Sequence, residues 1–261
     1  MATFKSKMSK LDPLWADKIW KAIKTGNKTV LAKSSNDYTK WVDAGKPGRP
    51  LSIMLPVAAL ALTGVRPISL ERGITFSIIE VDGISFIQAH SNGAKIVRNE
   101  KSEIIRGQED VKISWRLTPP AQASHRRDEM REILKAVLAA PNRSITISYN
   151  AESISTLLRE LSKKIWPRRK HHVSGICYRE LFSMAAKDAG TEPIELAAAM
   201  GHLSARSQEK YHRRQRGKGG IAPAKPFSSA TATTTPKAVV SPTDRLAAFK
   251  RKSAIKKLMH P

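Results

Sequence analysis

The chain has 261 residues, of which 41% are hydrophobic, so it can build a hydrophobic core and is not disordered throughout. Its 46 Lys and Arg against 22 Asp and Glu leave a formal net charge of +24, an excess that usually indicates a polyanionic partner. The single cysteine, Cys177, excludes a disulfide framework and any multi-cysteine zinc site. No apolar run approaches the roughly 18 residues that a membrane helix needs, and the first residues are not a signal peptide. These features predict a protein of the cytoplasm, associated with the nucleoid, with no membrane partner.

The positive charge is uneven along the chain. Residues 1–50 carry 11 basic and 4 acidic residues, residues 51–211 carry 23 and 17, and residues 212–261 carry 12 and 1. The middle is nearly balanced, as in a folded domain, while both flanks are basic enough to contact a phosphate backbone. With the turn-rich run after Lys46 as a boundary, we expect three parts: a short helical N-terminal segment at 1–46, a folded central domain at 47–215, and a basic, partly disordered linker and tail at 216–261.

Three tryptophans fall in the N-terminal segment. Residues 11–46 have apolar side chains near helical spacing and predict one or two short helices. Such short helices cannot bury much surface without large side chains, so we expect Trp15, Trp20 and Trp41 to be core residues.

The segment from Ile74 onward is typical of β-structure. Two β-rich runs, 74–81 and 84–87, flank Asp82-Gly83, which is a strong hairpin signal. A third run, 111–117, alternates apolar and polar residues, as expected of a strand with one face in water. The sequence therefore predicts a small antiparallel sheet.

Helical patterns account for most of the remaining chain. They cover 51–62, 126–139, 153–165, 179–189 and 192–200. Residues 216–243 are rich in Gly, Ala, Pro, Ser and Thr and are expected to be a linker without order of its own. The predicted fold class is mainly α with a small antiparallel β-sheet, an α+β fold.

Four residues carry the chemistry of this sequence. Thr63-Gly64-Val65-Arg66 ends a buried helix, Arg179 lies in a later helix, His202 follows Gly201, and Tyr211 comes nine residues after His202. Each of them alone could be an ordinary turn, cap or surface residue. In this order, with 23 residues from Arg179 to His202, they resemble the tyrosine recombinase family of phage and plasmid integrases.

The resemblance implies a reaction at a DNA phosphodiester. Arg66 and Arg179 would stabilise the negative charge that gathers on the nonbridging oxygens, and His202 would donate a further hydrogen bond. The phenolic oxygen of Tyr211 would attack phosphorus and form a 3′-phosphotyrosyl intermediate. Because that intermediate stores the bond energy, no metal, ATP or other cofactor is expected.

The leaving 5′-oxygen needs a proton, which the family takes from a lysine on a hairpin turn. Lys95 follows the Ser91-Asn92-Gly93 turn and is favoured, while a direct count along the hairpin places His90 there instead. Both alternatives stay open.

Two positions depart from the family pattern. The family has a histidine three residues before the second arginine, where this chain has Ile176; His172, with its neighbour His171, is an alternative proton donor from the preceding loop. The family also has a glutamate three residues after the first arginine, where this chain has Ser69, with Glu71 two residues later.

A basic run lies just before the helix of Arg179. Its place favours contact with the DNA backbone over a merely solvated loop. The residues expected to bind DNA are Lys163, Lys164, Arg168, Arg169 and Lys170.

The resulting hypothesis is a site-specific recombinase or integrase of a mobile element that acts on double-stranded DNA, as a homo-tetramer, with an accessory DNA-bending protein as a further partner. Hairpin telomere resolution is a related interpretation of the same chemistry. The alternative from another class is a cleavage-deficient relative that serves as a DNA-binding accessory factor. The tail of net charge +11 either holds DNA or docks on an adjacent protomer.

Overall fold

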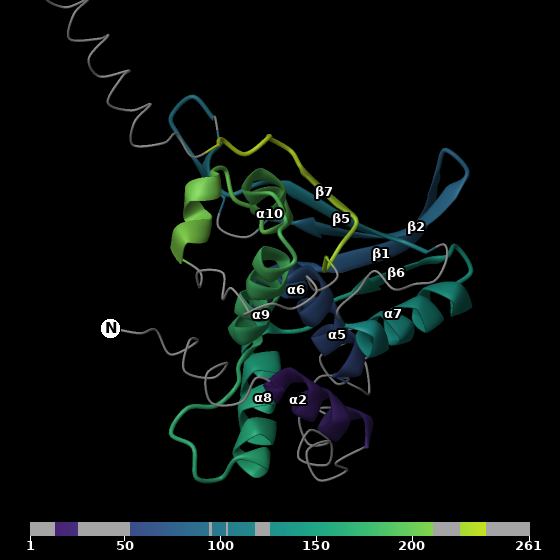
Figure 1. Cartoon of the computed structure of the whole chain (residues 1–261), viewed down its shortest axis with the longest axis vertical. Helices are drawn as coiled ribbons and strands as arrows, with labels where there is room; N and C mark the ends of the chain where they lie inside the picture. The colour runs from purple at the N-terminus through teal and green to yellow at the C-terminus, as the bar shows by residue number, and fades with distance from the viewer. Residues whose placement is uncertain are drawn as a thin grey trace, which may run out of the picture.

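The computed structural model describes residues 14–25, 53–93, 96–102, 104–117, 126–210 and 225–238. In these ranges the chain forms one five-stranded antiparallel sheet, with most of the helices gathered below it in the view of Figure 1. The α+β fold class predicted from the sequence is confirmed. Among the described residues no helix is long and apolar enough to cross a membrane.

The sheet has the strand order β6-β1-β2-β5-β7, and every neighbouring pair is antiparallel. The bounds are β1 Ile74–Val81, β2 Ile84–Asn92, β5 Asp110–Arg116, β6 Ser144–Ile147 and β7 Ser229–Ala232. Asp82 and Gly83 join β1 to β2 with φ of 51° and 73°. Two successive positive φ values match the right-handed twist of a hairpin, which is why an Asp-Gly pair occurs here.

One face of the sheet supplies the core. Phe76 of β1, Ile87 of β2 and Trp115 of β5 are buried, and the rings of Phe76 and Trp115 stack 6.4 Å apart. Lys112 and Arg116 of β5 point to solvent, as the alternation in the sequence predicts. The sheet thus has one apolar and one wet face.

Helix α5 (Met54–Thr63) is the centre of the helical layer, since every residue from Pro56 to Thr63 is buried. It packs against α7 (Arg127–Ala139) and α9 (Gly175–Asp188). The other helices of this part are α6 Pro67–Arg72, α8 Ala151–Ile165, α10 Pro193–Ala199 and the 3-10 helix η1 Ala205–Lys210. An apolar helix with no wet face needs neighbours all round, and these helices provide them.

The N-terminal helix α2 (Trp15–Lys24) shares this core. Trp15 and Trp20 are buried, as predicted, and the ring of Trp15 meets Tyr178 of α9 edge-on at 5.0 Å. Trp41 lies outside the described residues. The division of the chain near residue 46 therefore stays a prediction, while α2 itself packs on the same core as α5 and α9.

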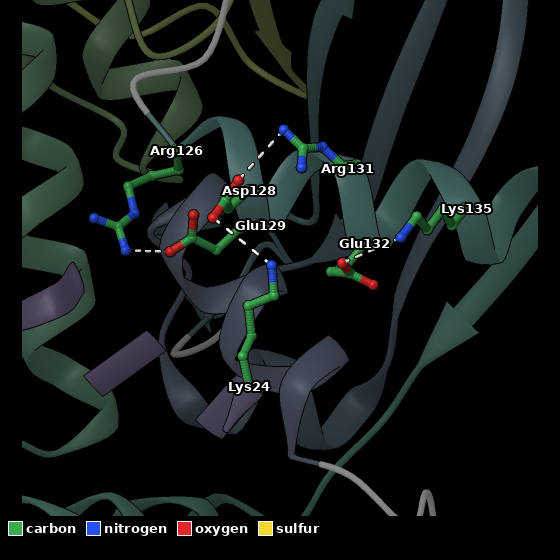
Figure 2. Close-up of polar contacts among 7 residues, drawn as sticks. All are labelled: Lys24, Arg126, Asp128, Glu129, Arg131, Glu132 and Lys135. Carbon is green, nitrogen blue, oxygen red and sulfur yellow. Dashed lines mark hydrogen bonds and ion pairs between the residues drawn. The ribbon is translucent and has the colours of Figure 1, made fainter. Parts of the chain in front are cut away.

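Ion pairs fasten α2 to the start of α7 (Figure 2). Lys24 lies 3.8 Å from Asp128, and Arg126 pairs with Glu129 one turn into α7. The Arg126 guanidinium also donates to Asp17 of α2 at 2.6 Å. The side chains of Arg126 and Glu129 are only 6% and 3% exposed, so this pair is shielded from water.

Residues 225–238 correct the linker prediction. β7 pairs with β5 along Val111 to Ser114, and Phe227 is 1% exposed, with its ring 5.5 Å from that of Phe182. The Trp115 indole N–H donates to the carbonyl of Pro226 at 2.5 Å. Composition predicted a linker because the segment has few apolar residues, yet one phenylalanine and an open edge of β5 are enough to order it. We call residues 225–238 the C-terminal strap.

Three elements have no clear pattern in the sequence. β6 is only four residues long, and α6 begins at a proline in a run that is typical of a turn. A two-stranded hairpin of β3 (Val97–Arg98) and β4 (Ile104–Arg106) extends the connection between β2 and β5. Short elements show too few periods for spacing to reveal them.

Candidate active site

A small pocket lies where the chain after α5 meets α9, the end of β2 and the end of α10. Its open space is about 280 Å³ including solvent at the mouth. The residues that give it polar character or shape are Arg66, Ser69, Ser91, Gly93, Arg179 and Gly201. Two of the four residues singled out in the sequence, 113 positions apart, thus line one pocket.

Arg179 forms the buried side of the pocket and is 2% exposed. Its guanidinium donates to the Gly64 carbonyl at 2.9 Å and to the Met200 carbonyl at 2.5 Å. These carbonyls are the C-caps of α5 and α10. Because the C-terminus of a helix carries partial negative charge, two helix ends together offset the cost of burying this cation.

Gly64 lets α5 end against α9. Its φ is +60°, and a Cβ there would lie 2.6 Å from the Cγ of Phe182. Both the left-handed conformation and the close approach require glycine. The Thr-Gly-x-Arg run of the sequence therefore places the Gly64 carbonyl on Arg179.

His202 is held by the way in which α10 ends. Its N–H donates to the Ala197 carbonyl at 2.8 Å, and the N–H of Gly201 donates to Ala198 at 2.9 Å. With φ of +64° at Gly201, these two bonds form a Schellman motif. The Gly-His pair thus fixes the histidine one residue after the glycine that stops the helix.

The His202 ring contacts the guanidinium directly. Its Nε2 atom lies 2.9 Å from Nη2 of Arg179, and the residue is 8% exposed. Because a guanidinium can only donate, Nε2 is the acceptor and the ring proton is on Nδ1. In this state, only the Nδ1 side of the ring can donate to a bound phosphate.

Arg66 lies at the rim of the pocket and is partly exposed. It is the N-cap of α6, and its carbonyl accepts from the N–H of Ser69 at 2.8 Å. Within the described ranges its guanidinium has no hydrogen-bond or ion-pair partner. A cation at the mouth and a buried cation behind it make the pocket suited to an anion.

Glu71 does not orient either arginine. Its carboxylate accepts from the Ala151 N–H at 3.2 Å and from the Asn150 amide at 3.3 Å, so it faces the start of α8. Ser69 is buried and lines the pocket in the place where the family has a glutamate. Main-chain carbonyls, not this acidic position, hold Arg179.

Tyr211 and Lys95 lie outside the described residues. η1 ends at Lys210, one residue before Tyr211, and β2 leads into Gly93, two residues before Lys95. The roles assigned to Tyr211 and Lys95 stay predictions.

The structure separates His90 from the pocket. Ser91 is buried and lines the pocket, and successive residues of a strand face opposite sides. His90 instead pairs with Asp110 across the sheet, Nε2 to Oδ1 at 2.9 Å, and is 40% exposed. The choice between Lys95 and His90 as proton donor stays a prediction.

His172 lies against α8, where its Nδ1 is 3.5 Å from the Ser162 hydroxyl, and it is not among the described lining residues. Burial lowers its pKa, and the positive charges of Lys163 and His171 lower it further. Ile176 is half-buried in the first turn of α9. The role of His172 as alternative proton donor stays a prediction.

The basic run after α8 is mostly exposed. Lys163, Lys164, Arg168 and Lys170 are exposed, while Arg169 is half-buried with its guanidinium 4.9 Å from the centre of the Trp166 ring. The stacking holds the loop in shape and leaves its other cations at the surface. Their role in DNA binding stays a prediction.

Sequence reasoning missed Gln108, Arg72 and Ser91. Gln108 is fully buried and donates to the His202 carbonyl at 3.2 Å, and Arg72 donates to the Gly93 carbonyl at 2.6 Å. No motif marks Gln108 and Arg72, because their partners are main-chain atoms far away in sequence. Among the described residues no three His, Cys, Asp or Glu side chains gather in a way that could hold a metal ion.

No protein-family model matches the chain, and no curated protein matches it. Among solved structures, the crystal structure of XerA recombinase is similar, with 17% sequence identity and a TM-score of 0.39. The match covers 77% of this chain and 58% of that protein, so the chain spans less than two thirds of its length. A functional conclusion therefore depends on the residues of the pocket.

Proposed function

We propose that the protein breaks and rejoins strands of double-stranded DNA through a covalent tyrosine intermediate. The observation that supports this most directly is the pocket that Arg66 and Arg179 share, with His202 on the second arginine. Two guanidiniums that converge from distant segments suit a single phosphodiester, whose charge they stabilise as the transition state forms.

In the proposed reaction, the scissile phosphate enters the pocket and its nonbridging oxygens contact Arg66 and Arg179. The Tyr211 oxygen attacks phosphorus as its proton passes to solvent water, the bond to the 5′-oxygen breaks, and a 3′-phosphotyrosyl bond forms. Lys95 gives the leaving 5′-oxygen its proton. Attack by a 5′-hydroxyl on the phosphotyrosine reverses these steps and rejoins the strand, without metal or ATP.

The broader setting follows from the same proposal. Recombination joins two duplexes, so we propose a homo-tetramer on DNA, aided by an accessory DNA-bending protein, that serves a mobile element. The chain's net charge of +24 favours a DNA partner.

A second function is a DNA-binding accessory factor without cleavage. Ile176 favours it, since the family's histidine is absent from that position. The two functions differ in one observable: the recombinase forms a covalent adduct with DNA, and the accessory factor does not.

The test is adduct formation on a nicked suicide substrate, in which the released fragment cannot return. We expect the full chain to become linked to DNA, and Tyr211→Phe to lose the adduct while DNA binding stays within a few-fold, because only the nucleophilic oxygen is removed.

The matched control is Tyr178→Phe. The Tyr178 hydroxyl is buried and hydrogen-bonds to no described residue, and burial raises the pKa of this phenol. The Tyr178→Phe variant should therefore form the adduct at the normal rate. Persistent adduct in Tyr211→Phe would refute the choice of nucleophile, and no adduct with the full chain would favour the accessory factor.

A further inference from the structure

Gln108 is a fully buried glutamine between the β3–β4 hairpin and β5. Its amide oxygen accepts from the Thr234 N–H at 3.0 Å, and its nitrogen donates to the Thr234 carbonyl at 2.6 Å and to the His202 carbonyl at 3.2 Å. Both amide hydrogens and the amide oxygen are thus in use. Because the Thr234 N–H needs an acceptor, its hydrogen bond identifies the oxygen atom of the Gln108 amide.

These bonds join three segments that are far apart in sequence. Thr234 belongs to the C-terminal strap, His202 to the end of α10, and Gln108 to the connection that carries Lys95. At the base of that connection the Gly93 N–H donates to the Glu109 carbonyl at 2.6 Å. Gln108 is therefore the described side chain at which the strap, the histidine segment and the hairpin meet.

The His202 backbone is held at both ends. Its N–H is fixed on the Ala197 carbonyl through the Schellman motif, and its carbonyl is fixed on Gln108. The ring has its own contact with Arg179 at 2.9 Å. Without Gln108, the carbonyl end can rotate and move the ring relative to the guanidinium.

We infer that Gln108 is a positioning residue for strand cleavage: it sets the orientation of His202 against Arg179 and couples it to the docked strap. The inference rests on the proposed function. Gln108 itself touches neither the phosphate nor the nucleophile in this role, and acts through the His202 backbone.

The first variant is Gln108→Leu, which keeps the size of the side chain and removes all three hydrogen bonds. The single-turnover rate of adduct formation at saturating DNA should fall roughly tenfold to a hundredfold, because a small misplacement of a catalytic group costs this much. DNA affinity should stay within twofold, since the phosphate-facing cations are untouched.

Thr233→Val is the matched control. The Thr233 hydroxyl accepts from the Asp110 N–H at 2.8 Å, next to Gln108 and Thr234, and has no contact with His202. The variant weakens the strap's attachment to the sheet alone. Its adduct rate should stay within twofold of the unmodified protein.

Gln108→Glu is a second variant that tests the inference if Gln108→Leu does not fold, because its adduct rate should recover at low pH. The introduced carboxyl faces two carbonyl oxygens, so only its protonated form can donate, and its one O–H replaces one of the two amide hydrogens. Its adduct rate relative to the unmodified protein should rise as pH falls from 8 to 5.5. A purely structural role would change the ratio only in parallel with the folded fraction of Gln108→Glu, which circular dichroism over the same pH range measures.

NMR of the His202 ring reports its position whether or not cleavage occurs. The ring resonances should shift in Gln108→Leu and not in Thr233→Val. Absence of adduct with the unmodified protein, together with this shift, would overturn the proposed function and leave the link between Gln108 and His202 standing. A normal adduct rate in Gln108→Leu, an equal loss in Thr233→Val, or unshifted ring resonances would overturn the inference itself.

Discussion

The two arginines of the pocket differ in how much the fold depends on them. Arg179 is buried and bonded to the ends of α5 and α10, whereas Arg66 lies partly exposed at the rim. Removing Arg179 leaves the Gly64 and Met200 carbonyls without this donor inside the protein. The two arginines have the same proposed role, contact with the phosphate, but only the loss of Arg179 should also reduce the stability of the fold.

We predict that Arg66→Ala slows adduct formation roughly a hundredfold, the cost of removing one interaction with the transition state, with an unchanged melting temperature. Arg179→Ala should slow it at least as much and also lower the melting temperature by several degrees, because a buried network is broken. Adduct kinetics and thermal unfolding, measured on both variants, check this. Normal cleavage by Arg66→Ala would exclude it from the site.

His172 lies beside the basic residues that are predicted to bind DNA, and its pKa should respond to a bound phosphate backbone. Burial and nearby cations lower its pKa in the free protein, so it is neutral at pH 7. DNA phosphates near Lys163 would offset those cations and raise the pKa again, so the complex would take up a proton.

DNA affinity should therefore rise as pH falls from about 7 to 5.5, and level off below the pKa of the free protein. One proton taken up gives at most a tenfold change per pH unit. In His172→Gln this part of the pH dependence should be lost, which fluorescence anisotropy at fixed salt can measure. An identical pH profile in His172→Gln would place the DNA away from this loop.

At the scale of elements, Arg126 at the start of α7 pairs with buried Glu129 of the same helix and with exposed Asp17 of α2. Glu129→Ala should lower the free energy of unfolding by about 3 kcal/mol, because it leaves the Arg126 charge shielded from water without its buried partner. Asp17→Ala removes the exposed partner, whose side chain is 60% exposed, and should cost about 1 kcal/mol or less. Urea unfolding of both variants tests the difference; equal costs would contradict it.

The Glu129 carboxyl also gives this contact a pH dependence. Burial raises its pKa above the usual value, with Arg126 acting in the opposite direction. Because the pKa of Glu129 is higher in the folded than in the unfolded state, its protonated form favours folding. This contribution to the free energy of unfolding is fully present below the pKa of the unfolded chain and is lost as pH rises through the pKa of the folded protein.

Long periodic elements were predictable from the sequence, and short ones were not. β1, β5 and α8 show clear alternation or helical spacing, and their predicted and observed spans differ by at most two residues at either end. β2 was predicted to end at residue 87 but continues to Asn92, so Ser91 and Asn92 of the predicted turn lie in the strand. β7 was missed because its order comes from pairing with β5 and from Phe227, both properties of the partner surface. Such tertiary effects leave no local pattern.

The candidate site was predictable only where the chemistry determines the side chain. The family resemblance carried by Arg66, Arg179 and His202 predicted a common site, and the structure brings both arginines to one pocket and His202 onto Arg179. The carbonyls that hold Arg179 and the amide of Gln108 could not be foreseen, because main-chain partners are set by how helices end in three dimensions.

For the whole molecule, the strap changes what the C-terminal region can do. After η1 the chain returns to its own sheet, where Phe227 fills the core and Lys237 bonds to Leu203 and Ala205. Removing everything after residue 216 would therefore expose core residues as well as remove charge. The role of the tail has to be tested on a chain that keeps the strap.

Deletion of residues 239–261 keeps β7 and removes six basic residues and one acidic residue. We predict weaker DNA binding and a flatter dependence of log K on log salt, by about 0.9 for each phosphate that the tail neutralises, with an unchanged melting temperature. The matched control keeps the full length and replaces five cations of the tail with Gln: Lys250, Arg251, Lys252, Lys256 and Lys257. Both variants should show the same decrease in the slope of log K against log salt, because charge alone carries the effect.

Unchanged binding with loss of tetramers in sedimentation, seen in the deletion and not in the Gln variant, would instead assign the tail to docking on an adjacent protomer.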